Sequence, residues 1–112
     1  MYALFVILNQ TEKLDEILEN LYELDTGATT IDSVGMGKLL LEHNVNEGIF
    51  SSISKILNEG KPYNKTLVSV IREKEILDQA IARIKGILNM DEKIGSGFMF
   101  VVPVLEIHGG LE

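Results

Sequence analysis

The chain has 112 residues, and we expect them to form one domain over residues 1–112 without a second folding unit. Hydrophobic residues make up 46% of it and charged residues 24%, a balance that is typical of a folded domain and excludes disorder. Ten basic and seventeen acidic residues give a net charge of -7 without a basic stripe, so the composition argues against nucleic acid as a partner.

Residues 2–8 are predicted to form the first strand. The run is continuously apolar and rich in aromatic and β-branched residues, which is typical of a strand buried on both faces. No basic segment precedes it, as a secretory signal would require, and the charged residues 11–13 follow at once. No stretch approaches the ~20 apolar residues of a membrane span, and there is no cysteine. We therefore expect a cytoplasmic protein that is not membrane-embedded.

An amphipathic helix is predicted next. Thr11 is a candidate cap, and Thr26-Gly27 is the predicted stop. Between them, leucine and isoleucine recur every three or four residues, while acidic residues occupy the remaining surface. We interpret the acidic residues as a solvated face, because they are spread around the helix and not gathered as metal ligands would be.

A second strand over residues 28–34 leads into a long connection over residues 35–62. A connection of this length is usually functional. Within it, apolar residues share one helical face and predict a short helix over residues 49–57. This helix packs on its own domain or on a neighbouring subunit, or it binds a partner protein through Ile49, Phe50 and Ile53.

The remaining elements are a third strand over residues 65–71, a helix over residues 75–90 and a final strand over residues 98–105. The final strand is apolar at both parities, so both of its faces must leave water. We expect the helices to cover one face and another subunit to cover the other. Pro103 places this strand at a sheet edge.

This order, β-α-β-β-α-β, predicts an α+β, ferredoxin-like fold with a four-stranded antiparallel sheet and two helices on one face. The first and third strands are central in that topology. The uncovered face carries five or six large apolar side chains of the first and last strands, and their burial represents on the order of 10 kcal/mol. We therefore expect closed self-association through these faces, with the copy number left open.

Two glycine-containing segments carry a resemblance to a known family. One is Thr26-Gly27-Ala28-Thr29 leading into Val34-Gly35-Met36-Gly37-Lys38, and the other is Lys93-Ile94-Gly95-Ser96-Gly97 followed by Phe100-Val101. In this order and topology they resemble the T-loop base and the glycine-rich B-loop of the PII superfamily of nitrogen-regulatory signalling proteins. The resemblance extends over essentially the whole chain.

The resemblance implies a signal-transduction protein and not an enzyme. It implies a homotrimer with inward-facing sheets and a nucleotide, such as ATP or ADP, in the clefts between subunits. There the T-loop base and B-loop of one subunit meet the tail of the next, and the T-loop regulates a transporter or enzyme. The implied nucleotide-binding positions are Ile7, Thr29, Gly35, Gly37, Lys38, Lys93, Gly95, Ser96 and Gly97. Glycine permits close backbone approach to a phosphate, and lysine supplies positive charge.

The chain also departs from the family. Phe98 stands where the family has a phosphate-binding lysine, and residues 105–108 replace arginines of its final strand. Hydrogen bonds to charged groups contribute ~1.5–3 kcal/mol each, so losing two or three weakens triphosphate binding by orders of magnitude. The modifiable tyrosine motif of the family's loop is absent as well.

Two interpretations remain open at this stage. In the first, the protein senses a small effector between subunits and acts on a partner through residues 35–62. In the second, it is a ligand-independent oligomeric interaction module that docks through the helix over residues 49–57, and residues 95–97 are only a tight turn. Neither requires catalysis, because His43 and His108 lie in no motif that supplies a nucleophile or a set of metal ligands.

Overall fold

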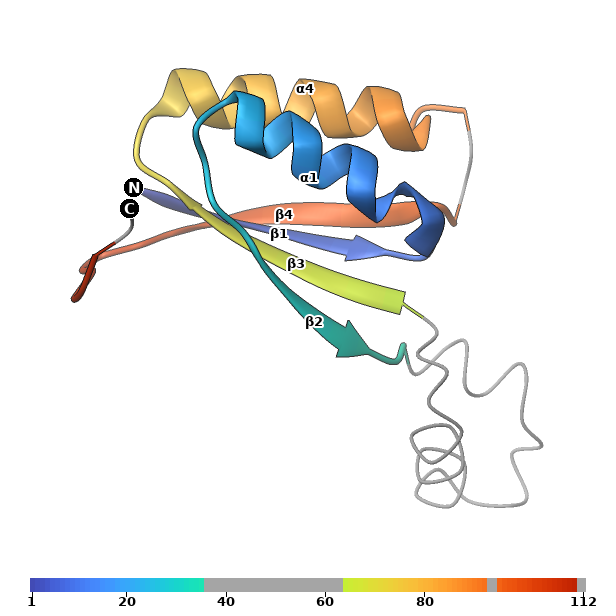
Figure 1. Cartoon of the computed structure of the whole chain (residues 1–112), viewed down its shortest axis with the longest axis horizontal. Helices are drawn as coiled ribbons and strands as arrows, with labels where there is room; N and C mark the ends of the chain where they lie inside the picture. The colour runs from blue at the N-terminus through green and yellow to red at the C-terminus, as the bar shows by residue number, and fades with distance from the viewer. Residues whose placement is uncertain (36–63, 93–94, 111–112) are drawn as a thin grey trace, which may run out of the picture.

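The computed structural model describes residues 1–35, 64–92 and 95–110 (Figure 1). In chain order its elements are β1 (Tyr2–Leu8), the 3-10 turn η1 (Thr11–Lys13), α1 (Leu14–Glu23), β2 (Thr29–Ser33), β3 (Asn64–Ile71), α4 (Lys74–Leu88) and β4 (Gly97–Pro103). The helix predicted over residues 49–57, and with it Ile49, Phe50 and Ile53, lies outside the described residues.

The four strands form one antiparallel sheet in the order β2-β3-β1-β4. At its centre, Leu4 of β1 pairs with Ser69 of β3 on one side and with Val101 of β4 on the other. The prediction that the first and third strands are central is confirmed, and Pro103 lies on an edge strand as predicted. The fold is α+β with a four-stranded antiparallel sheet and two helices, which is compatible with a ferredoxin-like fold.

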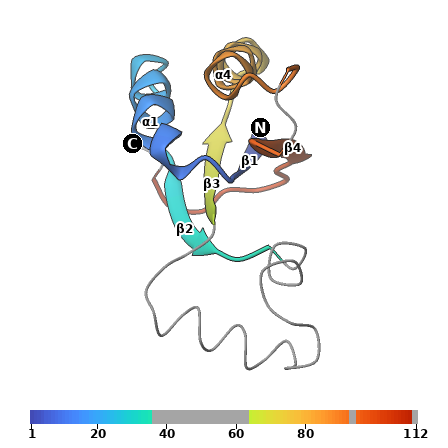
Figure 2. The same ribbon diagram turned by 90° about the vertical axis from the view of Figure 1, so that its right-hand side faces the viewer.

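Both helices lie on one face of the sheet, as Figures 1 and 2 show, and the hydrophobic core fills the space between these two layers. Alternation along β1 directs Leu4, Val6 and Leu8 toward the helices, and each is at most 1% exposed. The other large fully buried hydrophobic side chains are Ile17, Leu21, Leu67, Ile71, Leu77, Ile84 and Leu88. The predicted apolar stripes of both helices therefore face the core.

The first helix differs from the prediction at both ends. Thr11 begins a 3-10 turn, and no side-chain hydrogen bond caps that turn or α1. At the other end Asp25 adopts a left-handed conformation with φ 62°, and the Thr26 amide donates to the Leu21 carbonyl at 3.0 Å. The predicted stop at Thr26-Gly27 is therefore wrong, because Asp25 supplies the backbone geometry that we expected of a glycine.

The second helix ends in the same way. Asn89 has φ 52°, and the Met90 amide donates to the Lys85 carbonyl at 3.2 Å, so α4 stops at Leu88 and not at the predicted residue 90. Arg83 connects the two helices, because its Nη1 donates to Glu23 Oε2 at 2.8 Å. The helix layer is thus tied together on its surface as well as in the core.

The helices cover the edge strand β4 over only part of its length. Met99 pairs with Val6 on the helix side and is half-buried, whereas Val101 pairs with Leu4 and is still 38% exposed. The prediction that the helices shield one whole face of this strand is wrong for its second half. A single chain therefore leaves parts of both faces of β4 in water.

Candidate functional site

The sheet face opposite the helices is apolar and open to solvent. Its β1 and β4 residues pair across the strands as Ala3 with Val102, Phe5 with Phe100, and Ile7 with Phe98. The Phe5 and Phe100 rings stack with centroids 4.9 Å apart and an interplanar angle of 6°. Phe98 is 57% exposed and Phe100 43% exposed. We call this surface the open face.

β2 and β3 extend the open face toward the other edge. Val68 and Val70 of β3 are half-buried on it, and Ile31 of β2 is 51% exposed. Apolar side chains from all four strands are therefore gathered on one surface that nothing within the described part of the chain covers. A surface of this kind marks an interaction site in a soluble protein.

A polar cluster interrupts the open face where β2 ends and β3 begins. Ser33 donates to the side-chain oxygen of Asn64, and its hydroxyl lies 2.8 Å from the Thr66 hydroxyl. Asn64 is 4% exposed, and a Cβ atom built on Gly35 would lie 3.5 Å from its Nδ2. These contacts hold the two ends of the connection together. No sequence motif marks these polar residues, although Asn64 and Thr66 share the parity of the open-face residues of β3.

The glycine turn over residues 95–97 packs against the end of β1. Asn9 Nδ2 donates to the Gly95 carbonyl at 2.9 Å, and the backbone amides of Asn9 and Gln10 donate to the Ser96 carbonyl at 3.0 and 3.2 Å. Ser96 is 2% exposed. The turn therefore fixes where β4 enters the sheet, which is a structural role that does not depend on a ligand.

The backbone conformation at Gly95 and the close packing at Gly97 each explain why glycine occupies the position. Gly95 has φ 89°, a left-handed conformation that side chains other than glycine rarely adopt. A Cβ atom on Gly97 would lie 2.5 Å from the backbone oxygen of Ile7, which is too close for any side chain. Close packing of β4 on β1 thus requires glycine at residue 97.

Apart from Thr29, the predicted nucleotide-binding residues that the structure describes form a row along one end of the sheet. Ser33 pairs with Asn64, and Leu8 pairs with both Lys65 and Gly97, so the base of the connection and the glycine turn share this end. They lie on the opposite edge strands, however, which strand spacing separates by roughly 14 Å. Ile7 lies between them on the open face.

The other predicted positions divide into two groups. Thr29 is exposed at the start of the edge strand β2 and pairs with Val68, near the middle of β3. Gly37, Lys38 and Lys93 lie outside the described residues. One chain therefore does not gather the described positions into a single pocket, and a ligand that touched both edges would lie along the row.

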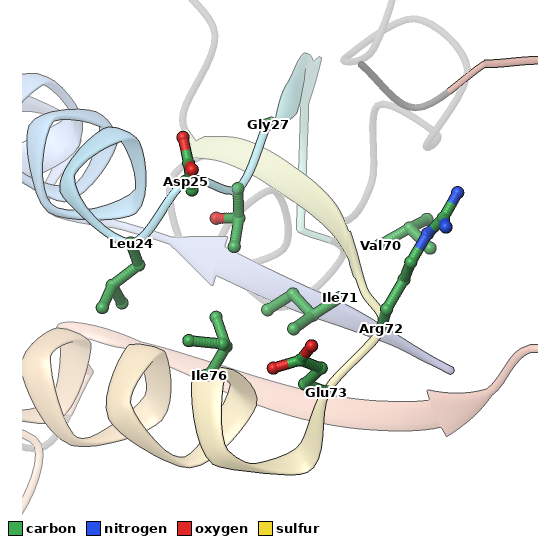
Figure 3. Close-up of a pocket in the computed structure, with 9 residues that line it drawn as sticks. Leu24, Asp25, Gly27, Val70, Ile71, Arg72, Glu73 and Ile76 are labelled. Atoms are coloured by element: carbon green, nitrogen blue, oxygen red, sulfur yellow. The ribbon is translucent and has the colours of Figure 1, made fainter.

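A hollow of about 330 Å³ lies at the opposite end of the sheet (Figure 3). Side chains of Leu24, Ile71 and Ile76 point toward one another around it, where α1 ends and α4 begins. Gly27 lies at its rim, close to Ser69, whose Oγ donates to the Gly27 carbonyl at 2.7 Å. No pattern in the sequence predicts this hollow, because its lining comes from the ends of several separate elements.

Charged side chains surround the hollow. Asp25, Arg72 and Glu73 are among its lining residues, and Arg72 forms no salt bridge within the described part of the chain. Lys74 is engaged instead with Asp78 at 2.5 Å, and this hydrogen bond raises the pKa of Lys74. Arg72 is thus an exposed cation beside a partly apolar depression.

Metal and membrane sites receive no support from the described residues. Within residues 1–35, 64–92 and 95–110, no three histidine or acidic side chains are placed to hold a metal ion together. None of the helices in these ranges has the length and apolar character needed to span a membrane.

No family model matches the chain, and no curated protein matches it.

Proposed function

We propose that this chain is the subunit of a homo-oligomeric regulatory protein of the PII-like kind. Copies associate through their open faces and bind a small effector, an adenine nucleotide such as ATP or ADP, in the clefts that association creates. Effector binding changes residues 35–62, which bind or release a regulated enzyme or transporter. A ligand shifts such a segment only through different affinities for its two states.

The observation that carries this proposal is the open face. Phe98, Phe100, Val102 and Ile31 are 57%, 43%, 37% and 51% exposed. Together they leave on the order of 300 Å² of apolar surface in water, and its burial contributes about 8 kcal/mol per subunit. Self-association removes this surface from water and so accounts for a sheet that is apolar on the side away from its own helices.

The arrangement of the predicted ligand residues supports a site between subunits. The base of the connection and the glycine turn lie at the same end of the sheet but on opposite edges. When edges of neighbouring copies meet, the turn of one copy approaches the loop base of the next. A cleft formed in this way brings together residues that a single chain keeps apart.

Light scattering at several protein concentrations tests the first half of the proposal. We expect a particle of constant mass, larger than 12.5 kDa, over the micromolar range. A monodisperse particle of 12.5 kDa would refute self-association and with it the clefts between subunits.

Calorimetric titration with ATP, ADP and cyclic dinucleotides tests the second half. We expect saturable binding that Lys38→Ala or Lys93→Ala weakens by about tenfold or more, since each removes a charge-assisted contact. Lys85→Ala, on the outer surface of α4, is the matched control and leaves the affinity unchanged. An oligomer that binds none of these nucleotides would favour the ligand-independent interaction module.

A further inference from the structure

The segment that follows β4 alternates apolar and polar side chains, and most of them are exposed to solvent. The Val104 amide donates to the Met1 carbonyl at 3.1 Å, and beyond this bond residues 105–110 leave the sheet. Leu105 is 90% exposed, the largest exposure among the large hydrophobic residues that the structure describes. Along this tail, apolar Leu105 and Ile107 alternate with charged Glu106 and ionisable His108. Its own chain therefore leaves the apolar side chain of Leu105 uncovered, whereas Ile107 is half-buried.

The hollow between α1 and α4 lies at the same end of the sheet as this tail. Tyr2 pairs with Pro103 on one side and with Ile71 on the other, so the last residues of β4 and β3 are neighbours of the same residue. The tail begins beside one edge strand, while the hollow lies toward the other edge, near Gly27 and the start of β2. Figure 1 shows the tail, in dark red, passing the end of the sheet and then turning back.

We propose that the tail of one copy, residues 104–108, docks into the hollow of the next copy, with Leu105 as its apolar anchor. The depression of about 330 Å³ is large enough for a leucine side chain, and Leu24 and Ile76 offer it apolar contact. Charge complements this fit, because Glu106 of the tail meets the exposed Arg72 beside the hollow.

The geometry favours a second copy over the chain's own hollow. The Val104–Met1 hydrogen bond holds the start of the tail beside β1, and two strands separate β4 from the side of the sheet where β2 begins. Because the tail leaves one edge of the sheet and the hollow lies near the other edge, copies that bind in this way make head-to-tail contacts. Such contacts close into a ring when the rotation between neighbouring copies allows it.

The inference rests on the proposed self-association but places the tail at a different end of the sheet from the glycine turn. The resemblance to the PII superfamily brings the tail to the T-loop base instead. Occupation of the hollow and occupation of the T-loop base are therefore distinguishable by position.

Disulfide trapping tests the position directly, because the natural chain contains no cysteine. Tagged Leu105→Cys protein is mixed with untagged Gly27→Cys protein and oxidised, and hybrid disulfides of intermediate mass are counted. Disulfide formation requires Cα atoms within about 7 Å. We expect the hybrid yield to exceed by about tenfold that of a control mixture of Leu105→Cys with Gly86→Cys, which lies on the outer surface of α4.

A second pair of variants tests the energetics without a covalent bond. Gly27→Phe places a large side chain at the rim of the hollow, where a Cβ atom meets nothing within 4 Å, and circular dichroism checks that the variant folds. Leu105→Ser removes the anchor. Each weakens self-association by about tenfold to a hundredfold, the effect of losing one buried large apolar side chain. Gly86→Phe, also with nothing within 4 Å of its Cβ, and Tyr22→Ser, an exposed residue of α1, are controls that leave association unchanged.

The outcomes separate the two proposals. A stable oligomer in which hybrid yield equals the control yield overturns the tail contact and leaves the open-face interface in place. An intramolecular disulfide in the doubly substituted chain, without hybrids in the mixture, also overturns the inference, because the tail then occupies its own hollow. Monomers at every concentration overturn both proposals.

Discussion

Replacement of Phe98 by serine probes the open face most directly. Phe98 is 57% exposed in the single chain and pairs with Ile7 at the edge of the sheet, so the isolated fold depends little on it. Because an aromatic side chain presents about 200 Å², an interface that covered the exposed fraction would bury roughly 110 Å² of it. At about 25 cal/mol per Å², this amounts to roughly 3 kcal/mol per subunit.

A loss of about 3 kcal/mol raises the dissociation constant by roughly a hundredfold for each interface copy. Sedimentation equilibrium over a range of concentrations measures the change, and circular dichroism checks that the variant is folded. Tyr22→Ser is the matched control, because Tyr22 is 83% exposed but lies on α1, on the other side of the sheet. If Phe98→Ser associates as tightly as the natural chain, the open face is not the interface.

Three further predictions concern the folded chain and are measured by chemical denaturation. Gly97→Ala lowers the free energy of unfolding by about 1–3 kcal/mol, because its Cβ would lie 2.5 Å from the Ile7 carbonyl oxygen. Gly110→Ala is the control and has little effect, because there is open space around its Cβ. Equal stabilities of the two variants would show that β4 does not need this close approach. Gly86→Ala raises the free energy of unfolding by up to about 1 kcal/mol, because residue 86 belongs to α4 and a Cβ atom there meets nothing within 4 Å. A loss of stability would mean that other residues cover this surface of the helix. Ser69→Ala lowers the free energy of unfolding by about 1 kcal/mol, since Ser69 is 1% exposed and its hydroxyl donates to the Gly27 carbonyl. An unchanged value would show that this bond does not secure the segment before β2.

Nucleotide affinity would depend on charges that the described residues only partly supply. Phe98 is an uncharged residue on the open face, and its ring stacks near that of Phe100 with the centroids 6.3 Å apart. Its position suits an interface better than a phosphate site. Weak triphosphate binding, with preference for an effector of lower charge, is therefore the expected result of the titration.

Strand and helix positions could be predicted because they depend on local patterns. Continuous apolar runs marked β1 and β4, and recurrence at three and four residues marked α1 and α4. Helix ends were less predictable, since Asp25 and Asn89 take left-handed conformations that glycine is expected to adopt. Their cost is offset by capping hydrogen bonds such as that from Thr26 to Leu21, which no local pattern reveals.

The candidate site was predictable only in part. The glycines of residues 95–97 stood out in the sequence, but their contacts with Asn9, Gln10 and Ile7 depend on β1 and β4 lying side by side. The cluster of Ser33, Asn64 and Thr66 joins residues about thirty positions apart. Small polar residues of this kind are common in any strand, so only their pairing across β2 and β3 distinguishes them.

The sequence by itself determined the secondary structure, the strand order and the apolar character of both faces of the last strand, because these follow from side-chain periodicity and from chain connectivity. Only the tertiary structure decided which apolar residues stay in water, where the glycine turn packs, and that the tail and the hollow share one end of the sheet. These features depend on distances between segments remote in the chain, and periodicity carries no information about such distances.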